Sequence, residues 1–372
     1  MSASTRATRP LRVLVFAQYP PDTAPGQRFR FEQYIGPLAQ LGIELEPRTI
    51  LDEQTLATLY QRGNLWSKVR FGARGIVERI KDVVAARQYD LAFVYRAVYP
   101  VGPSVFELAL RQLGVPYVLD FDDAIYIPHT SQANWFVKPL KYAGKTASSA
   151  AAASLVTTGN AHLAAWARRH NPNVRVLPTT IDTTSYAYAP VDPSKEGPLT
   201  IGWTGSATTT PHLVTIGNAL AQLQREEGIR IRVVGERSFR IPGAEVDATD
   251  WRADSEVADL REFDIGIMPL PDDEWSRGKC GLKALQCMAL GIPTVMSPVG
   301  VNTDIARGGA AVLASSHEGW VKALRDLLHN PAERARLAAA GRERVVASYS
   351  VDGNVDVWAD ALRSVPSVKA RR

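Results

Sequence analysis

RGKCGLKALQCMALGIPTVMSP, residues 277–298, is the stretch from which the fold of this chain can be predicted. A basic turn punctuated by glycine leads into an apolar run, Leu282 to Leu290, which predicts a short helix. Gly291 and Pro293 end that helix, because glycine is favoured just past a helix end and proline cannot continue it. Thr294 to Met296 then reads as a buried strand. A helix followed directly by an apolar strand is typical of an α/β fold.

The start of this helix carries positive charge. Lys279, Lys283 and Gln286 are spaced i, i+4 and i+7, so they share one face if the helix begins near Lys279. Exposed backbone N–H groups and the helix dipole favour an anion at such a position, although an ordinary solvated basic helix start is the alternative. An apolar strand, residues 264–270, comes just before. Ligands of open α/β sheets bind where a strand ends beside a helix N-terminus, which favours the anion site.

The longer segment 264–300, DIGIMPLPDDEWSRGKCGLKALQCMALGIPTVMSPVG, resembles the donor-binding segment of retaining glycosyltransferases of the GT-B fold. The resemblance is to group 1, the large family related to glycogen synthase. Its signature is a helix reading roughly Lys-x-x-x-Lys-x-x-Glu, or Glu-x7-Glu, followed by an alanine-rich stretch and Gly-x-Pro-Val. Gln286 stands in place of the second glutamate and Gly278 in place of the first. The lysine-bearing variant therefore matches, and the acidic pair is absent.

The resemblance implies an α/β fold with two Rossmann-like domains that face each other across a cleft. Residues 1–190 would form the N-terminal, acceptor-side domain and residues 191–350 the C-terminal, nucleotide-sugar-binding domain. Residues 351–372 would supply a helix that returns to the first domain, and a tail. A proline-rich polar stretch, residues 189–198, is typical of a linker. The patterns predict strands over 12–17, 43–48, 90–95, 114–120, 154–158, 174–178, 199–203, 229–235, 264–270, 294–296 and 311–313. They predict helices over 29–41, 60–88, 104–113, 161–169, 212–227, 282–290, 318–328, 331–348 and 351–365.

The loop after the first predicted strand contains Gly26 and Arg28 but no Gly-x-Gly-x-x-Gly motif, which argues against an NAD or FAD enzyme. In the family that the chain resembles, this loop holds a glycine that approaches the donor phosphate. Gly26 is the candidate for that role and Arg28 for a neighbouring contact. A turn glycine and a surface arginine are the alternative interpretation.

Three carboxylates, Asp120, Asp122 and Asp123, gather where the strand 114–120 ends. Neighbouring carboxylates raise one another's proton affinity, so one of them could accept a proton from an acceptor hydroxyl. They could instead hold a divalent ion or cap a turn. Together with the resemblance, this makes Asp122 and Asp123 catalytic candidates beside Lys279 and Lys283.

A turn rich in hydroxyl groups, with Thr204, Gly205 and Ser206, follows the strand 199–203 and precedes a helix. Strand, glycine-containing turn and helix together form a cradle for an anion. The resembling enzymes often use an arginine and a lysine for the diphosphate. Here the resemblance assigns that charge to Lys279, Lys283 and Arg277, a ribose contact to Gln286, and a close approach to sugar or phosphate to Gly300.

Composition limits the class of protein. The chain has 372 residues, of which 45% are hydrophobic and 22% charged, as in soluble globular proteins. No apolar run is long enough to cross a bilayer, no secretory signal is apparent, and two cysteines seven residues apart fit a reduced, cytoplasmic compartment. A net charge of +5 is compatible with an anionic ligand or an anionic membrane surface, and is too mild to indicate nucleic acid. Basic stretches with interleaved aromatic residues, 60–88 and 134–145, either dock on the inner face of a membrane or are ordinary solvated faces.

We therefore expect a retaining glycosyltransferase of the hexosyltransferase type. It would move a sugar from a nucleotide-diphosphate donor to a glycan or lipid-linked acceptor, in bacterial polysaccharide or envelope glycan synthesis. The donor would bind mainly to the second domain and the acceptor to the first, and the scheme requires neither a metal nor a cofactor. A nucleotide-sugar epimerase is one alternative. A non-catalytic homologue that binds a nucleotide sugar or a glycan is another, which the absent acidic pair keeps open.

Overall fold

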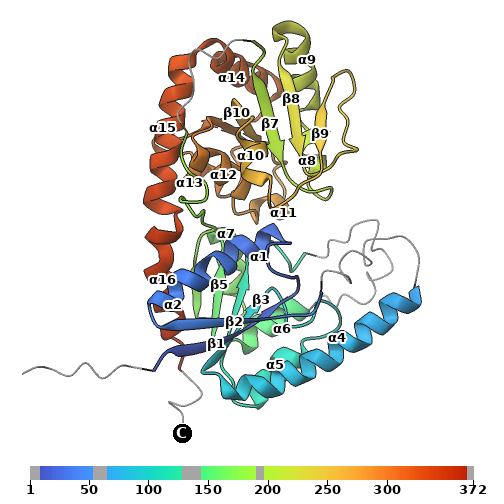
Figure 1. The fold of residues 1–372 in the computed structure, drawn as a ribbon, viewed down its shortest axis with the longest axis vertical. Coiled ribbons are helices and arrows are strands. Elements are labelled where there is room, and N and C mark those ends of the chain that lie inside the picture. Colours follow the sequence, from blue (N-terminus) through green and yellow to red (C-terminus); the bar gives the residue numbers. More distant parts are fainter. Residues whose placement is uncertain (1–8, 53–64, 128–143, 190–196, 367–372) are drawn as a thin grey trace, which may run out of the picture. The chain divides into compact units, whose positions relative to one another are not determined.

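A computed structural model describes residues 9–52, 65–127, 144–189 and 197–366 of the chain, which divides into two compact units (Figure 1). The first unit is Met1–Leu177 with Val355–Arg372, and the second is Pro178–Asn354. Most of the predicted basic stretch 134–145, most of the predicted linker 189–198 and the beginning of the stretch 60–88 lie outside the described residues.

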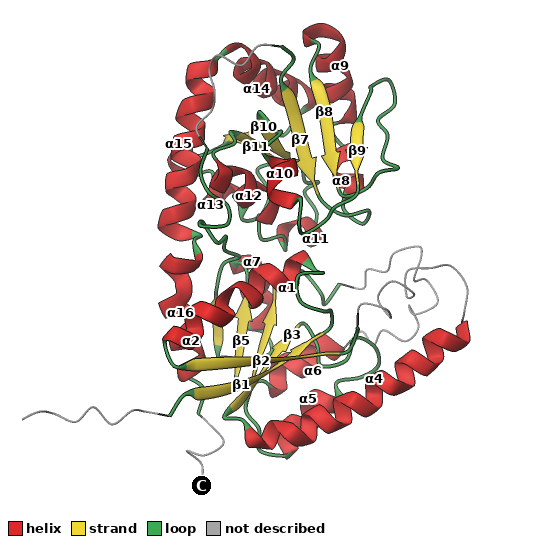
Figure 2. Cartoon of the chain, viewed as in Figure 1, coloured by secondary structure: helices red, strands yellow, loops and turns green. Residues whose placement is uncertain are grey.

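The first unit is built on a six-stranded parallel sheet in the order β2-β1-β3-β4-β5-β6. Its central strands are continuous apolar runs because helices surround the sheet, as Figure 2 shows. The sheet order changes direction between β1 and β3, so the segments that follow these strands diverge at the carboxyl edge. The strands are β1 Leu11–Ala17, β2 Ile43–Thr49, β3 Leu91–Tyr95, β4 Tyr117–Phe121, β5 Leu155–Thr158 and β6 Val174–Val176.

The helices of the first unit are α1 Pro25–Arg30, α2 Ile35–Gln40, α4 Leu65–Ala85, α5 Val105–Gln112, α6 Lys145–Ala152 and α7 Ala161–Ala167, with short 3-10 turns at Glu32–Tyr34 and Ala86–Gln88. The continuous helix predicted over 29–41 is wrong. At Phe31 the backbone leaves the helical region, with φ −137° and ψ −29°. The Phe31 ring packs edge-on against Phe93 and Tyr95, each 6.1 Å away between centroids, and this packing accompanies the break.

The C-terminal helix α16, Val351–Arg363, begins in the second unit and continues in the first. Trp358, 2% exposed, packs its ring 5.1 Å from that of Tyr34 and 5.8 Å from that of Phe93. The last described segment of the chain therefore completes the core of the first unit.

The second unit has another six-stranded parallel sheet, in the order β12-β11-β10-β7-β8-β9. Numbered from its own first strand, this is the doubly wound order 6-5-4-1-2-3 of Rossmann folds. Its hydrophobic core gathers Ile201, Trp203, Val233, Ile267 and Val295 from the strands with Leu220 and Leu324 from covering helices. The strands are β7 Thr200–Thr204, β8 Arg230–Val234, β9 Asp247–Thr249, β10 Ile265–Met268, β11 Thr294–Met296 and β12 Val312–Leu313. The predicted α/β class, with two Rossmann-like units, is confirmed.

The helices of the second unit are α8 Thr210–Val214, α9 Gly217–Glu227, α10 Glu256–Leu260, α11 Glu274–Arg277, α12 Leu282–Leu290, α13 Asn302–Ile305, α14 His317–His329 and α15 Pro331–Ser348, with a 3-10 turn at Arg307–Gly309. The helix predicted over 212–227 is divided, because Ile216 has φ −113° and ψ 9° between α8 and α9. The helix 282–290 and the strand 294–296 are confirmed.

The helix α12 begins later than the shared face of Lys279, Lys283 and Gln286 requires. Gly281 precedes it in the left-handed region, with φ +76°, and α12 starts at Leu282. Lys279 lies in the segment between α11 and α12. A single helical face that carries Lys279 with the other two residues is therefore wrong.

Candidate functional site

The topological switch points locate the places where a ligand would bind in each sheet. In the second unit the switch lies between β7 and β10, and in the first between β1 and β3. The sequence-predicted residues follow these strands or their neighbours. Thr204, Gly205 and Ser206 end or follow β7, whereas Arg277, Lys279 and Lys283 come after β10.

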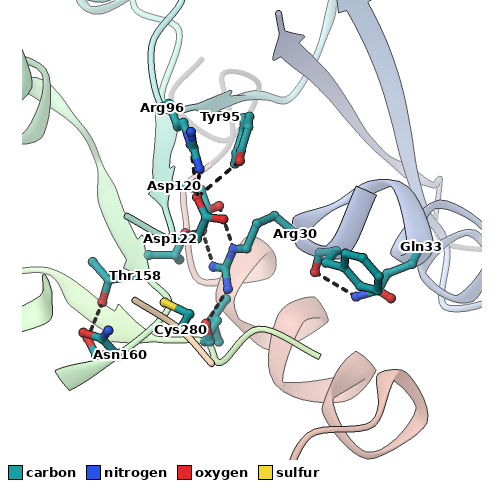
Figure 3. A network of polar contacts seen from close by, with 12 residues as sticks. Arg30, Gln33, Tyr95, Arg96, Asp120, Asp122, Thr158, Asn160 and Cys280 are labelled. Carbon is teal, nitrogen blue, oxygen red and sulfur yellow. Dashed lines mark hydrogen bonds and ion pairs between the residues drawn. The ribbon is translucent and has the colours of Figure 1, made fainter. Parts of the chain in front are cut away.

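At the carboxyl edge of the first sheet, Arg96 lies among acidic side chains (Figure 3). Its Nη2 donates to Oδ1 of Asp122 at 2.7 Å and to Oδ2 of Asp123 at 3.1 Å. The hydroxyl of Tyr95 donates to the same Asp122 oxygen at 3.2 Å. The predicted pair Asp122 and Asp123 is thus brought together around one guanidinium.

The backbone at Arg96 has a left-handed conformation, φ +63°, which is uncommon for a residue other than glycine. Its N–H donates to the carbonyl of Asp120 at 2.7 Å, which holds the turn after β3 against β4. Burial lowers the pKa of Arg96, but the charges of Asp122 and Asp123 outweigh burial and leave this pKa well above its ordinary value. The cluster is therefore a permanently charged ion pair network.

Gly26 lies in the first turn of α1, directly over this cluster. A Cβ atom at this position would stand 2.4 Å from the Tyr95 hydroxyl and 3.1 Å from Oδ2 of Asp122. Only a residue without a side chain lets α1 approach so closely. Arg28, two residues further along the chain, places its guanidinium 4.8 Å from the centroid of the Phe29 ring.

Asp120 has a different environment from its two neighbours. Its side chain is fully buried, and Arg30 forks onto both of its oxygens, with 3.0 Å from Nε to Oδ2. The Thr157 hydroxyl donates to Oδ1 at 2.7 Å, and Arg30 also reaches the carbonyl of Leu177. Figure 3 shows this fork. Of the roles left open for Asp120, the structure supports the internal structural one.

In the second unit, the turn after β7 is held by its own hydroxyl groups. Ser206 N–H donates to Oγ1 of Thr209 at 3.0 Å, and the hydroxyls of Ser206 and Thr208 lie 2.9 Å apart. Ser206 and Thr208 are exposed, whereas Thr204 is buried. The turn offers exposed hydroxyl groups at the switch point of the sheet.

The Trp203 ring connects Lys283 to this turn. The Nζ of Lys283 is 4.5 Å from the centroid of the Trp203 ring, a cation–π contact. A Cβ atom on Gly205 would be 2.4 Å from the same ring, so the indole contacts Gly205 as well as Lys283. Two sequence-predicted groups, the 204–206 turn and Lys283, are thus brought together by Trp203.

Lys279 and Arg277 lie in the segment that leads into α12. The Nζ of Lys279 is 4.7 Å from the centroid of the Trp275 ring. Arg277 donates through Nε to Oδ1 of Asp272 at 2.7 Å, and this hydrogen bond raises the pKa of Arg277 and lowers that of Asp272. Gly300, with φ +57°, lies against the backbone of Arg277, because a Cβ there would be 2.8 Å from the Arg277 carbonyl oxygen.

Gln286 points into the interior and is 2% exposed. Its amide nitrogen donates to the Tyr186 hydroxyl at 3.0 Å and to Oε1 of Glu256 at 2.9 Å. Glu256, itself 2% exposed, also accepts from Tyr186 at 2.6 Å and from Trp251 Nε1 at 2.8 Å. A ribose contact by Gln286 would have to use the amide oxygen or open this network.

Several residues in these arrangements were not predicted from the sequence. Tyr95 and Arg96 could have been found, because they end and follow β3 as Asp122 and Asp123 follow β4, and parallel strands end at one edge. Trp203 and Trp275 carry no motif. Glu256 gave no signal either, since two of its partners, Gln286 and Tyr186, are 30 and 70 residues away.

Two properties of the described residues bear on the predicted membrane contact and the predicted absence of a metal. No described helix is long and apolar enough to cross a membrane. No group of three or more His, Cys, Asp or Glu side chains in the described ranges has an arrangement that could hold a metal ion.

Comparison with known proteins places these features in context. Residues 217–360 match the family model described as glycosyl transferase-like. No curated protein matches the sequence. Sucrose-phosphate synthase from Thermosynechococcus elongatus is similar in structure, with a TM-score of 0.70 at 15% identity over 95% of this chain and 98% of that one.

HepE of Anabaena in complex with UDP-glucose gives a TM-score of 0.67 at 16% identity, covering 95% of this chain and 100% of that one. An alpha-glucosyltransferase in complex with UDP and a 13-mer DNA containing a HMU base gives 0.65 at 11% identity, covering 95% and 100%. At such identities the likeness shows the fold, which is that of GT-B glycosyltransferases. Together with the family match, it supports a GT-B glycosyltransferase.

Proposed function

We propose that this chain is a retaining hexosyltransferase that moves a sugar from a nucleotide-diphosphate donor to a glycan or lipid-linked acceptor, in bacterial polysaccharide or envelope glycan synthesis. The observation that carries the proposal is the match of residues 217–360 to a glycosyl transferase-like family. This stretch contains Lys279, Lys283 and α12, the residues on which a donor pyrophosphate would depend.

We assign the donor to the second unit. The HepE structures hold UDP or UDP-glucose, and we extend this donor class to the present chain. The exposed hydroxyls of Ser206 and Thr208 would bind phosphate oxygens, and Lys279, Lys283 and Arg277 would balance their charge. Because charge builds up on the diphosphate as the sugar leaves, these cations stabilise the transition state more than the bound donor. Arg277 would first exchange its partner Asp272.

We assign the acceptor to the first unit, at the cluster of Asp122, Asp123 and Arg96. A carboxylate there would accept the proton of the acceptor hydroxyl as its oxygen bonds to the anomeric carbon. Arg96 and Tyr95 donate hydrogen bonds to Asp122, so this base would be held at a fixed position. The lysines balance the diphosphate charge in this scheme, which therefore includes no metal ion and no cofactor.

The same proposal places the protein in the cytoplasm, attached peripherally to the inner face of a membrane where a lipid-linked acceptor would be reached. Cys280 and Cys287 are buried and form no disulfide in the described residues, as expected in a reducing compartment. Burial raises the pKa of Cys287 to about 12, which keeps this thiol unreactive.

A thermal-shift panel of UDP-, GDP-, ADP- and dTDP-sugars, followed by an assay of donor hydrolysis, tests the proposal. We expect one nucleotide class to raise the melting temperature and to be hydrolysed slowly without an acceptor. Lys283→Ala should lose the shift, and Lys322→Ala, which removes an exposed lysine of α14, should keep it. If none of the donors binds, the proposal is wrong.

The same assay separates the two alternatives. An epimerase would convert the donor sugar without any acceptor and without releasing nucleoside diphosphate. A non-catalytic homologue would bind the donor and release nothing. The observation that favours the second alternative is the buried, hydrogen-bonded Gln286 at the place where the resembling family carries a glutamate.

A further inference from the structure

The helix α4 of the first unit carries an exposed aliphatic stripe. Ile76, Val77, Ile80 and Val84 are between 42% and 58% exposed. Thirteen large hydrophobic side chains are exposed among the described residues, and seven of them lie on α4, on α5 or at the end of α5. The two helices are neighbours in the first unit (Figure 1). Exposed aliphatic side chains are therefore concentrated on one part of this unit. The other three are Val105, Leu108 and Leu113.

The buried face of α4 fixes which way this stripe points. Arg79 is fully buried and donates through Nε to the Val98 carbonyl at 2.9 Å and through Nη1 to the Arg48 carbonyl at 3.0 Å. Its Nη2 reaches the carbonyl of Ala17, the last residue of β1. Arg79 thus binds carbonyls near the ends of β1 and β2 and after β3. These bonds fix the rotation of α4 about its axis. The stripe is therefore held outward.

Cations border the stripe along one edge. At about 100° of rotation per residue, Arg70, Arg74 and Lys81 all fall within about 60° of Val77, on the side away from Ile76. All three are exposed. The acidic residues of this part of α4, Glu78 and Asp82, fall beyond them and pair with Lys81 and Arg79 at 2.9 Å each. Going around the helix, aliphatic, cationic and then ion-paired acidic side chains follow one another.

We propose that this stripe, with its cationic edge, docks on an anionic lipid bilayer; the inference rests on the peripheral membrane attachment in the proposed function and assigns it a surface. The aliphatic side chains would enter the boundary between headgroups and acyl chains, and the cations would contact lipid phosphates. A bilayer supplies both an apolar layer for the aliphatic side chains and negatively charged headgroups for the cations beside them. With 21 residues α4 is about 31 Å long, and its polar face makes it a helix that lies on a membrane. This surface uses none of the residues assigned to donor or acceptor.

Co-sedimentation of the full chain with vesicles tests this surface. Vesicles of phosphatidylcholine alone are compared with an equimolar mixture of phosphatidylcholine and phosphatidylglycerol. We expect binding to the anionic vesicles that weakens as salt is raised. The double variant Ile80→Ser with Val84→Ser should lower the partition coefficient at least about tenfold on anionic vesicles. Arg70→Gln with Arg74→Gln should lower it by about tenfold or more on the same vesicles.

The matched control is Val214→Ser with Val346→Ser, which removes two exposed valines from α8 and α15 and should leave vesicle binding unchanged. Circular dichroism melts show whether each variant is folded, and the thermal shift with UDP-sugar shows whether the donor site is intact. The proposal is overturned if the wild type binds neither vesicle, or if the α4 variants and the control variant bind alike. It is also overturned if Ile80→Ser with Val84→Ser dissociates a dimer and leaves vesicle binding unchanged.

Discussion

At the carboxyl edge of the first sheet, the cation Arg96 lies between two carboxylates, whereas at that of the second sheet Lys279 and Lys283 lie over indole rings. The two edges belong to the same kind of sheet and occupy equivalent places at a switch point. One fold thus holds cations at equivalent edges in two ways, among carboxylates in the first unit and on the faces of indole rings in the second.

The buried hydrogen bonds next to the two edges also differ. The buried fork of Arg30 on Asp120 lies under the first, and the network of Glu256, Tyr186 and Gln286 lies behind the helix that carries Lys283.

Replacing Arg30 by methionine should have the largest effect, because it leaves the Asp120 carboxylate buried without its partner. We expect the free energy of unfolding of the first unit to fall by about 3–5 kcal/mol. Urea denaturation followed by circular dichroism measures this. Adding Asp120→Asn should recover part of the loss, and a double variant no more stable than the single one would show that the pair is not the support of this edge.

Asp122→Asn should come next. Removing a positioned proton acceptor is expected to lower the transfer rate about 100-fold, at the low end for general base catalysis because Arg96 already stabilises this carboxylate. Nucleotide affinity should change by no more than about twofold, since the donor is assigned to the other edge. Steady-state kinetics with a separate nucleotide titration measures both. Equal losses in the two quantities would mean that Asp122 is structural.

Lys283→Ala should remove a charge-assisted contact of about 1.5–3 kcal/mol, or about 10- to 150-fold in transfer. Lys279→Ala should have an effect in the same range, because its ammonium group is held in the same way on Trp275. Initial rates with saturating acceptor measure both, and Lys322→Ala serves as the exposed control. Wild-type rates in both variants would reject the edge of the second sheet as the donor site.

Ser206→Ala should have the smallest effect. One neutral hydroxyl contact is worth about 0.5–1.5 kcal/mol, so donor affinity should fall by no more than about tenfold. Calorimetric titration with the nucleotide sugar measures it, and Ser206→Thr, which keeps the hydroxyl, should bind nearly as the wild type does. A loss as large as that of Lys283→Ala would show that the turn, and not the charge, dominates the second edge.

Much of the fold could be predicted from the sequence wherever local signals are strong. The helix 282–290 has a glycine at each end and a proline beyond, and both of its bounds are those of α12. The helix over 331–348 is predicted with the same accuracy, since Pro331 and the capping Asn330 mark its start. The breaks at Phe31 and Ile216 were missed. Both residues have non-helical backbone angles, and neither residue type on its own indicates the end of a helix.

The candidate site could be predicted only in part. The residues that follow strands, such as Asp122 and Ser206, were found because strand ends are visible in the sequence. The position of Lys279 was missed, since it depended on where α12 begins, and Gly281 adopts a left-handed cap conformation at that point. The surroundings of Gln286 were also missed, because Glu256 and Tyr186 are brought to it from elsewhere in the second unit by the fold alone.

The second unit is one uninterrupted length of chain, and its two ends are tied together. Ile181 donates to the Tyr349 carbonyl at 2.8 Å and accepts from the Val351 N–H at 3.1 Å. A chain segment whose first and last residues lie side by side can be removed as one piece without breaking its own sheet. We expect residues 178–354, expressed alone, to fold and to bind nucleotide. The remainder, rejoined by a short linker before Trp358, should keep the residues assigned to the acceptor. Such a layout would let donor preference be exchanged between relatives in one recombination event.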